Sequence, residues 1–308
     1  MRPVTILEVG PRDGLQNEQV EFSTDAKLNL INRAIAAGAT RMEVCSFVHP
    51  KRVPQMADAE AVVSALPDDK AVQYIGLILN KRGYLRALET REGGKRGVDQ
   101  VGAVVVATDT FGQKNQGQTI EEGIAETSGI LRLAKQDGMS AQVTLSAAFG
   151  CPFEGEVPQA RVVDIAKRLA DAEPAEICVA DTIGAGIPSE VTDLLGKLKD
   201  AIPGMPLRVH FHDTRHTGVA NAWAAYEMGV DTIDASMGGL GGCPFAPKAT
   251  GNVATEDVVY MLERAGVATG INLDVLIDGA DWLQTILGRK TVAAVSQAGG
   301  FPAASAAE

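Results

Sequence analysis

The stretch that decides the fold is LRVHFHDTRHTGVANAWAAYEMG, which spans residues 207–229. Its first five residues, Leu207 to Phe211, form an apolar segment that is typical of a short buried strand. Farther on, Val219, Trp223 and Tyr226 follow one another at helical spacing, and a glycine then provides a helix stop. The stretch therefore predicts one strand followed by one amphipathic helix.

The same unit of strand and helix recurs along the chain. Apolar, β-branched-rich segments are spaced at roughly regular intervals, with helical patterns between them. Eight strands alternating with helices favour an α/β fold, the (β/α)8 TIM barrel. An open doubly wound sheet is the alternative, but no G-x-G-x-x-G follows the first strand. The expected strands are residues 4–9, 42–48, 72–79, 101–107, 142–147, 176–180, 207–211 and 232–236.

Amphipathic segments lie between the strands and after the last one. Residues 24–37 and 158–170 are two of them, and a further helix is expected at 272–290. We therefore expect a (β/α)8 catalytic domain, a helical extension packed on the barrel, and a disordered tail of small and polar residues. The expected limits of these three parts are 1–270, 271–298 and 299–308.

The composition fits a large folded protein. Of its 308 residues, 45% are hydrophobic and 22% are charged, which is enough for a sizeable core. The formal net charge of −11 argues against a nucleic-acid partner, which would need a basic face. The first apolar run is too short for a signal peptide or a membrane span. The cysteines at 45, 151, 178 and 243 are far apart in sequence, so we expect free thiols and a cytoplasmic protein.

Two of the four histidines, His210 and His212, lie at the end of the quoted strand. Side chains two residues apart in a strand project from the same face, so the two imidazoles can lie side by side. Such a pair is a common way to hold a divalent metal, although two neighbouring histidines also occur by chance. The pair alone leaves metal binding open.

Catalytic groups of such barrels gather at the carboxyl ends of the strands. The Asp-Thr pairs at 181–182 and 213–214 also fit helix N-caps, and that alternative stays open. Glu43 needs a partner, because a carboxylate inside an apolar strand is costly to bury. A salt bridge to Arg12 inside the barrel is the interpretation we favour. The polar residues expected at this rim are Arg12, Asp13, Glu43, Ser46, Asn80, Ser146, Asp181, Thr182, His210, His212 and Ser236.

A glycine-rich stretch follows the eighth expected strand. Four glycines within residues 238–242 permit positive φ angles, close approach of the backbone to a ligand, or motion of a lid. Cys243 at the end of this stretch suits a proton donor that arrives when the loop closes, although a plain surface loop is the alternative. Asn252 is either a neutral oxygen ligand for a hard cation or a turn residue.

Several blocks of the sequence together resemble one known family, the 3-hydroxy-3-methylglutaryl-CoA lyases. They occur in the family's order, the resemblance covers nearly the whole chain, and the blocks are specific at the level of the family. The blocks are VGPRDGLQNE (9–18), SFV (46–48), VPQM (53–56), GCPFEG (150–155), DTIG (181–184), HFHDT (210–214), GLGGCP (239–244) and GNVATED (251–257).

The resemblance implies a metal-dependent carbon–carbon lyase on a TIM barrel. The metal ligands that it implies are Asp13, His210, His212 and Asn252, which would hold Mg²⁺ or Mn²⁺. The cation would make the tertiary hydroxyl of the substrate more acidic, and His210 or Asp13 would remove its proton. Arg12 would stabilise the enolate formed when the carbon–carbon bond breaks, and Cys243 would protonate its carbon.

The resemblance further implies an acyl-CoA substrate, a homodimer and a retro-Claisen cleavage to acetyl-CoA and a keto acid. The substrate contacts that it implies are Gln16, Glu43, Thr144, Asp181, Thr182 and Arg215. One alternative is a 2-oxo-acid synthase or aldolase of the same metal-dependent superfamily, although the glycine loop that ends in a cysteine belongs to the CoA lyases. Another alternative is a barrel that binds acyl-CoA without cleaving it.

Several positions depart from the family's pattern. Gln142 and Thr144 stand where the hydroxymethylglutaryl-CoA enzymes carry Arg and Tyr, and Gln19 replaces a Lys. Residues 215–217 are Arg-His-Thr rather than an aromatic residue, Gly and Gln. The missing ring at Thr144 predicts a substrate with a different or bulkier C3 group, and neutral drift within the family is the alternative. Arg215 adds a cation that either meets a substrate carboxylate or pairs with a neighbouring acid.

Overall fold

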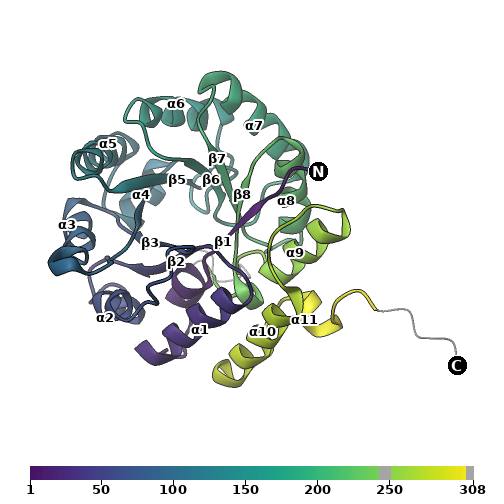
Figure 1. Cartoon of the computed structure of the whole chain (residues 1–308). Coiled ribbons are helices and arrows are strands. Elements are labelled where there is room, and N and C mark those ends of the chain that lie inside the picture. The colour runs from purple at the N-terminus through teal and green to yellow at the C-terminus, as the bar shows by residue number, and fades with distance from the viewer. Residues whose placement is uncertain (243–250, 303–308) are drawn as a thin grey trace, which may run out of the picture.

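The chain folds into a closed barrel of eight parallel strands with helices around it (Figure 1). This computed structural model describes residues 1–242 and 251–302. The barrel closes because β1 (Thr5–Glu8) pairs with β8 (Thr232–Ala235), with Thr5 beside Thr232 at the start of the register. Closure confirms the predicted TIM barrel and excludes the open doubly wound sheet.

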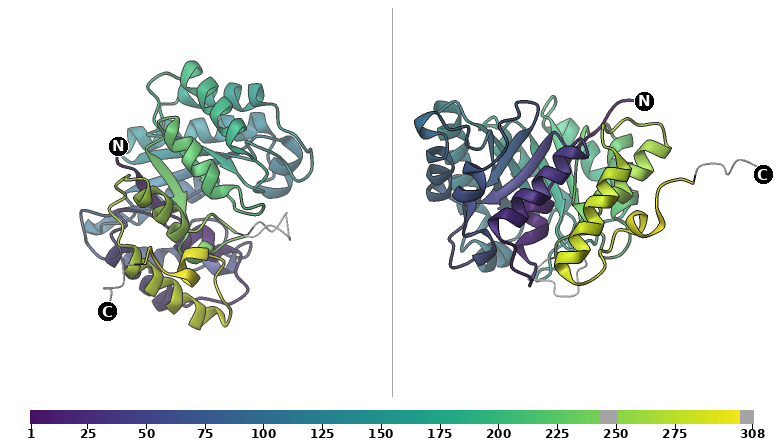
Figure 2. Two further views of the ribbon diagram at one scale, coloured as in Figure 1. Left: turned by 90° about the vertical axis from the view of Figure 1, so that its right-hand side faces the viewer. Right: turned by 60° about the horizontal axis from the view of Figure 1, so that its bottom comes forward.

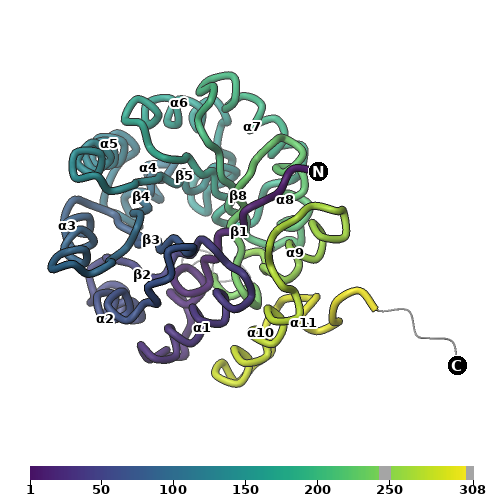
Figure 3. The backbone as a smooth tube through the Cα atoms, viewed as in Figure 1, coloured from purple at the N-terminus to yellow at the C-terminus, as the bar shows by residue number. Residues whose placement is uncertain are grey.

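All eight strands lie where the sequence predicts them, with ends that shift by a few residues. β2 (Arg41–Ser46), for example, corresponds to the predicted segment 42–48. Each strand pairs with its neighbours in sequence, so the order around the barrel is the order along the chain (Figure 3). The remaining strands are β3 (Gln73–Leu77), β4 (Gln100–Val106), β5 (Ser140–Ser146), β6 (Ile177–Asp181) and β7 (Leu207–Phe211).

The helices surround the barrel and pack on the outer faces of the strands (Figure 1). The helices predicted at 24–37, 158–170 and 272–290 are confirmed as α1 (Thr24–Ala36), α6 (Gln159–Ala170) and α10 (Leu273–Leu287). The other helices are α2 (Ala59–Ser64), α3 (Lys81–Glu89), α4 (Asp109–Asn115), α5 (Ile120–Gln136), α7 (Pro188–Ala201), α8 (Gly218–Glu227), α9 (Thr255–Arg264) and α11 (Ala294–Ala298). Short helical turns are η1 (Gly10–Gly14), η2 (Pro54–Met56), η3 (Glu92–Gly94) and η4 (Met237–Gly239).

Local sequence signals set the ends of several helices. The side chain of Ser23 accepts a hydrogen bond from a backbone amide in the first turn of α1. Thr119 and Glu122 form a reciprocal capping box at the start of α5. Just past α1, Gly38 has a φ of 104°, and a Cβ there would lie 2.3 Å from the carbonyl oxygen of Gly270. Glycine is therefore required where the end of α1 meets the segment that leads into α10.

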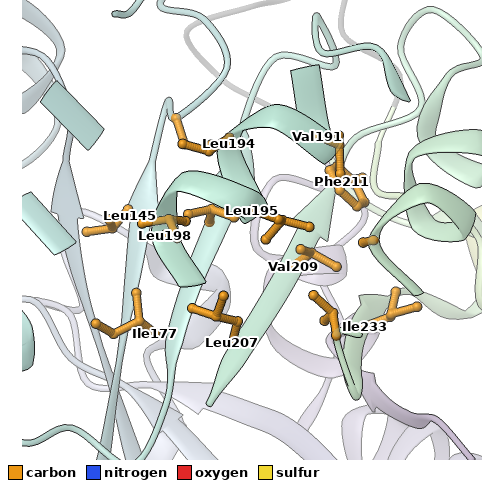
Figure 4. Close-up of a cluster of buried hydrophobic side chains, with 14 of the residues drawn as sticks. Leu145, Ile177, Val191, Leu194, Leu195, Leu198, Leu207, Val209, Phe211 and Ile233 are labelled. Carbon is orange, nitrogen blue, oxygen red and sulfur yellow. The ribbon is translucent and has the colours of Figure 1, made fainter. Parts of the chain in front are cut away.

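The main apolar core lies between the barrel and the helices. Figure 4 shows the part where α7 faces the outer side of β7. The α7 side chains in this core are Val191, Leu194, Leu195 and Leu198, all fully buried. Burial of one such leucine contributes about 1.5–3 kcal/mol to folding relative to its exposure. Because strand side chains alternate, Val209 and Phe211 face this core, whereas His210 lines the cleft at the mouth of the barrel.

The C-terminal helices continue the outer layer. α10 packs against α1 and α9 (Figure 2). The carboxylate of Asp257 on α9 accepts hydrogen bonds from the backbone amides at residues 294–295, which attaches α11. The domain limits at residues 270 and 298 stay predictions, and residues 303–308 of the predicted tail lie outside the described residues. Within the described ranges, no helix is both long and apolar enough to cross a membrane.

Candidate active site

The carboxyl ends of the strands open into a cleft of about 1310 Å³. Because all strands of a parallel barrel end on the same side, polar residues far apart in the sequence can meet there. The predicted site residues that line the cleft are Arg12, Asp13, Gln16, Glu43, Asn80, Thr144, Ser146, Thr182, His210 and His212. We take this cleft as the candidate active site.

Arg12 and Asp13 are held by the tight turn η1, which follows β1 directly. Three successive backbone amides of the turn donate to one carbonyl oxygen at its start. The turn packs closely on the segment after β8, so that a Cβ at Gly14 would lie 2.8 Å from Oγ of Ser236. Glycine at this position therefore permits the close approach that directs Arg12 and Asp13 toward the barrel mouth.

Arg12 forms the predicted ion pair with Glu43 inside the mouth of the barrel. Nε and Nη2 of Arg12 lie 2.8 and 2.5 Å from Oε2 of Glu43, and Nη1 lies 2.6 Å from Oδ1 of Asp13. Burial lowers the pKa of Arg12, but the two carboxylates outweigh this effect and raise that pKa. A fixed cation therefore lines the cleft, where it can stabilise negative charge on a bound molecule.

Asp13, His210 and His212 form a cluster of possible metal ligands. One ligand atom from each lies within 4.8 Å of the others. Nε2 of His210 is 3.9 Å from Oδ2 of Asp13, and the two imidazole rings have centroids 5.3 Å apart. Both histidines line the cleft, as their spacing in the sequence predicts.

Asn252 lies beside this cluster, although it comes 40 residues after His212 in the chain. The two residues form an isolated antiparallel bridge, and Nδ2 of Asn252 donates to the carbonyl oxygen of Leu240 at 3.0 Å. Oδ1 of Asn252 is buried and has no hydrogen-bond partner among the described residues. Because an unpaired buried oxygen is costly, this atom fits a ligand to a bound cation.

The protonation states suit a cation site. Burial raises the pKa of Asp13, but Arg12 and the two histidines outweigh it and bring that pKa to about 2, so the carboxylate is charged at neutral pH. Burial and the neighbouring His210 lower the pKa of His212 to about 4, which leaves its ring neutral. Charged carboxylates and neutral imidazoles are the forms that bind metals. Together with Oδ1 of Asn252, they fit a divalent cation.

His210 has a second partner inside the barrel. Its Nδ1 lies 3.1 Å from Oδ2 of Asp234 on β8, and Arg208 donates to the same carboxylate oxygen. Burial lowers the pKa of His210, whereas Asp234 and Asp13 raise it by more. Asp234 therefore orients the ring with Nε2 toward Asp13.

The remaining predicted substrate contacts in the cleft are polar. Oγ1 of Thr144 accepts from Nη2 of Arg208 at 3.1 Å, and Oγ1 of Thr182 is 2.9 Å from Oγ of Ser146. Oε1 of Gln16 is buried without a hydrogen-bond partner in the described part of the chain. These side chains offer hydroxyl and amide groups to a bound molecule, and their roles as substrate contacts stay predictions.

Asp181 and Arg215 are not among the residues that line the cleft. The carboxylate of Asp181 accepts from the backbone amides at residues 185–186, at 2.9 and 2.8 Å, as a residue that caps a loop does. Nη1 of Arg215 donates to the carbonyl oxygens at residues 183–184, at 3.0 and 2.7 Å. Both side chains therefore bind the loop after β6, and their contacts with substrate stay predictions.

Cys243, the predicted proton donor, lies outside the described residues. The glycine stretch before it is described as far as Gly242, which lines the cleft. Nδ2 of Asn17 donates to the carbonyl oxygen of Gly242 at 2.8 Å. The last described residue of the stretch thus lies at the cleft, and the role of Cys243 stays a prediction.

Three buried charged residues, Glu8, Arg208 and Asp234, are not among the site residues predicted from the sequence. They lie in strands and are 1%, 4% and 3% exposed. Arg208 and Asp234 form an ion pair in the wall of the cleft, whereas Glu8 bonds to other groups. The rule that singled out Glu43, a charge inside an apolar strand, applies equally to all three and could have found them.

Comparison with known proteins agrees with the fold and the site. The HMGL-like family matches residues 3–282. An (R)-citramalyl-CoA lyase of Chloroflexus aurantiacus is 40% identical over 97% of this chain and 96% of that protein. A hydroxymethylglutaryl-CoA lyase of Bacillus subtilis is 39% identical over 94% of both chains.

A solved structure extends the likeness to three dimensions. It is an HMG-CoA lyase of Acinetobacter baumannii in complex with coenzyme A and 3-methylmalate. It matches this chain with a TM-score of 0.92 at 36% identity, covering 99% of this chain and 98% of that chain. The chain therefore belongs to the HMGL-like family and is a carbon–carbon lyase.

Proposed function

We propose that the protein is a divalent-metal-dependent lyase that cleaves a 3-hydroxy-3-substituted glutaryl-CoA to acetyl-CoA and a 3-keto acid. The substrate is hydroxymethylglutaryl-CoA or a bulkier analogue. The observation that carries the proposal is that the fixed cation of Arg12 and the cluster of Asp13, His210 and His212 lie in one cleft. The names of the two relatives, both lyases of acyl-CoA compounds, support it.

The metal ligands in this proposal are Asp13, His210, His212 and Asn252. A divalent cation bound there would supply Lewis acidity that lowers the pKa of the substrate's tertiary hydroxyl. The proton of that hydroxyl passes to a base, for which His210 and Asp13 are the candidates. The raised pKa of His210 favours it over Asp13, whose pKa is about 2.

The two roles proposed for His210 exclude each other at one nitrogen. Its Nδ1 is bonded to Asp234, so Nε2 alone faces the cleft. A ring that binds the cation through Nε2 has no free nitrogen with which to accept a proton. The pH dependence of metal binding separates the two roles, because only a ring that binds the cation loses affinity when it is protonated.

Arg12 is proposed to stabilise the charge that moves during bond cleavage. When the bond between C2 and C3 breaks, its electron pair moves into the enolate of acetyl-CoA, and C3 becomes the ketone carbon of the keto acid. The guanidinium of Arg12 is already held by Glu43 and Asp13, so it requires little reorganisation to meet the enolate oxygen. Protonation of the enolate carbon completes acetyl-CoA, and Cys243 is the proposed donor.

Two possible substrates differ at the carboxylate end. Hydroxymethylglutaryl-CoA and citramalyl-CoA differ by one methylene between the carbinol carbon and the carboxylate. A second candidate function is therefore cleavage of (R)-citramalyl-CoA to acetyl-CoA and pyruvate, favoured by the 40% identity to a lyase of that name.

The size of the C3 group of the substrate is a separate point. Thr144 has a small side chain in the wall of the cleft, which favours a larger C3 group.

A panel of thioesters tests these proposals. The purified protein with Mg²⁺ or Mn²⁺ is supplied with hydroxymethylglutaryl-CoA, its C3-ethyl analogue or (R)-citramalyl-CoA, and release of acetyl-CoA and the keto acid is followed. The highest kcat/KM for the C3-ethyl compound would support the bulkier substrate. A clear preference for the C3-methyl compound would contradict the proposal that the C3 group is bulkier than methyl. Pyruvate release at the highest kcat/KM would establish the second candidate. Metal-independent release, or release from none of the three, would contradict the metal-dependent lyase.

The synthase or aldolase that acts on 2-oxo acids stays a separate alternative. Substitution of Cys243 with Ser discriminates, because a thiol proton donor is proposed for the CoA lyase. A large loss of turnover supports the lyase, and little effect supports the alternative. The homodimer and the cytoplasmic location stay predictions.

A further inference from the structure

Glu8 is a buried carboxylic acid to which the proposed reaction assigns no role. It is the last residue of β1 and is 1% exposed. Leu7 and Val9 on either side of it pack with Ile75 in a separate small cluster. Because strand side chains alternate, Glu8 projects from the other face of β1.

Glu8 connects three segments that are far apart in the sequence. Its Oε1 accepts hydrogen bonds from the backbone amides of Gly10 at 2.7 Å and Met237 at 2.9 Å. Its Oε2 accepts from Oγ1 of Thr255 at 2.7 Å. One side chain therefore joins the turn η1, the turn η4 and the first residue of α9.

Each of these segments contains a candidate metal ligand or adjoins a residue that contacts or precedes one. Gly10 begins the turn that holds Asp13. Met237 begins η4, and the next residue after η4, Leu240, accepts a hydrogen bond from Asn252 at its carbonyl oxygen. Thr255 begins the helix that follows Asn252 after two residues. The ligands from the two ends of the chain thus share Glu8 as a common support.

The surroundings of Glu8 leave it little freedom to move. A Cβ at Gly10 would lie 2.6 Å from Oε1 of Glu8, so only glycine permits this approach. On the other side of Met237, the carboxyl of Glu256 accepts from the backbone amide of Gly238 at 2.8 and 3.0 Å. Two buried acidic side chains therefore hold successive amides at the start of the glycine stretch.

From this geometry we propose that Glu8 is a positioning residue for the metal site. Its three hydrogen bonds hold the turn that carries Asp13 and the segment that carries Asn252 at the separation that one shared cation requires. The inference rests on the proposed metal-dependent function. Glu8 does not line the cleft, so it acts through the residues that do. Glu8 contacts no ligand directly, so we take the loss that follows removal of a ligand's own hydrogen-bond partner, about 10- to 100-fold in metal affinity or activity, as the scale of the expected effect.

The test is Mn²⁺ binding by the full-length protein, followed through the electron paramagnetic resonance signal of free Mn²⁺. Glu8→Ala removes all three hydrogen bonds and should raise the dissociation constant about 10- to 100-fold. Glu8→Gln should restore binding to near the wild-type value, because its Oε1 can accept from both amides while its Nε2 donates to the hydroxyl of Thr255. Thr255→Val removes one bond with little change of shape and should have an intermediate effect.

Asp257→Ala is the matched control. Asp257 is also a carboxylate that accepts from two backbone amides, but these belong to residues 294–295 at the start of α11. Its substitution should leave the Mn²⁺ dissociation constant unchanged. With each variant saturated in metal, kcat should fall for Glu8→Ala while KM for the acyl-CoA stays constant, because no residue that lines the cleft is altered.

The outcomes separate the inference from the proposed function. Wild-type Mn²⁺ affinity in Thr255→Val and in any folded Glu8→Ala protein would overturn the positioning role, and Thr255→Val alone decides if Glu8→Ala does not fold. Equal losses in Glu8→Ala, Glu8→Gln and Asp257→Ala would also overturn it, because that pattern indicates general destabilisation. Failure of the wild-type protein to bind Mn²⁺ would overturn the proposed metal site itself, and the inference with it.

Discussion

Nδ1 of His210 lies 3.1 Å from Oδ2 of Asp234, and this contact joins the candidate metal site to the ion pairs inside the barrel. Arg208 donates to the same oxygen of Asp234, and its Nε lies 3.2 Å from Oε1 of Glu176. The carboxylate accepts the proton of Nδ1, which selects the tautomer with a free lone pair on Nε2. That lone pair points to the side where Asp13 lies.

Metal affinity is expected to fall as the pH falls below the pKa of His210. Burial lowers this pKa, but Asp234 and Asp13 raise it above the ordinary value of 6.5, so the protonated ring competes with the cation for Nε2. Below that pKa, Mn²⁺ affinity should fall about tenfold for each pH unit, because one proton is displaced. Mn²⁺ titrations between about pH 5 and 8 measure this slope.

Asp234→Asn is the control for that pH dependence. The neutral amide no longer raises the pKa of His210, so the fall in affinity should move to lower pH. The pKa of His212 is about 4, so His212 does not contribute over most of this range. An affinity that does not change with pH in the wild-type protein would mean that His210 is not a ligand, which leaves its Nε2 free to act as the base.

Removing the charge of Arg12 is expected to lower kcat and to leave KM nearly unchanged. Arg12→Gln should cost about 10²–10³ in kcat, the usual effect of losing one preorganised donor to a developing oxyanion. Arg12→Lys keeps the charge but loses the contacts of both Nε and Nη2 with Glu43, so its loss should be smaller but clear. Steady-state kinetics at saturating metal check both variants. A rise in KM alone would contradict stabilisation of the enolate.

Thr144→Tyr is expected to change which substrate is preferred. A ring at this position reduces the space in the cleft, so the ratio of kcat/KM for a C3-ethyl over a C3-methyl substrate should fall about 10-fold or more. Thr144→Ser keeps the hydroxyl that accepts from Arg208 and should leave the ratio unchanged. If the ratio stays the same in Thr144→Tyr, this wall of the cleft does not meet the C3 group.

Leu195→Ala is expected to lower the free energy of unfolding by about 2–5 kcal/mol, because it leaves a cavity between α7 and the barrel. Leu85→Ala, at a side chain that is 43% exposed, is the matched control and should cost less than about 0.5 kcal/mol. Urea unfolding measures both. The folded Leu195→Ala protein should keep the wild-type kcat/KM, since Leu195 does not line the cleft.

The barrel and much of the site could be predicted because the relevant signals are local. Alternation within residues 207–211 places His210 and Phe211 on opposite faces of the strand, a relationship that does not depend on the rest of the chain. The partner of Glu43 could also be predicted, since a buried carboxylate requires a cation and Arg12 lies in the turn that follows the neighbouring strand β1. The requirement that a buried carboxylate has a partner does not identify the partners of Glu8. They are two backbone amides and a hydroxyl, groups that any sequence contains.

The sequence by itself determined the fold class, the identities of the candidate ligands and the ion pair of Arg12 with Glu43. Only the tertiary structure decided that Asp234 orients His210, that Arg215 bonds to the loop after β6, and that Glu8 bonds to Met237, 229 residues away. The physical reason is closure of the barrel. Pairing of β1 with β8 brings the two ends of the chain together, and the distances across that junction depend on the packing of all eight strands.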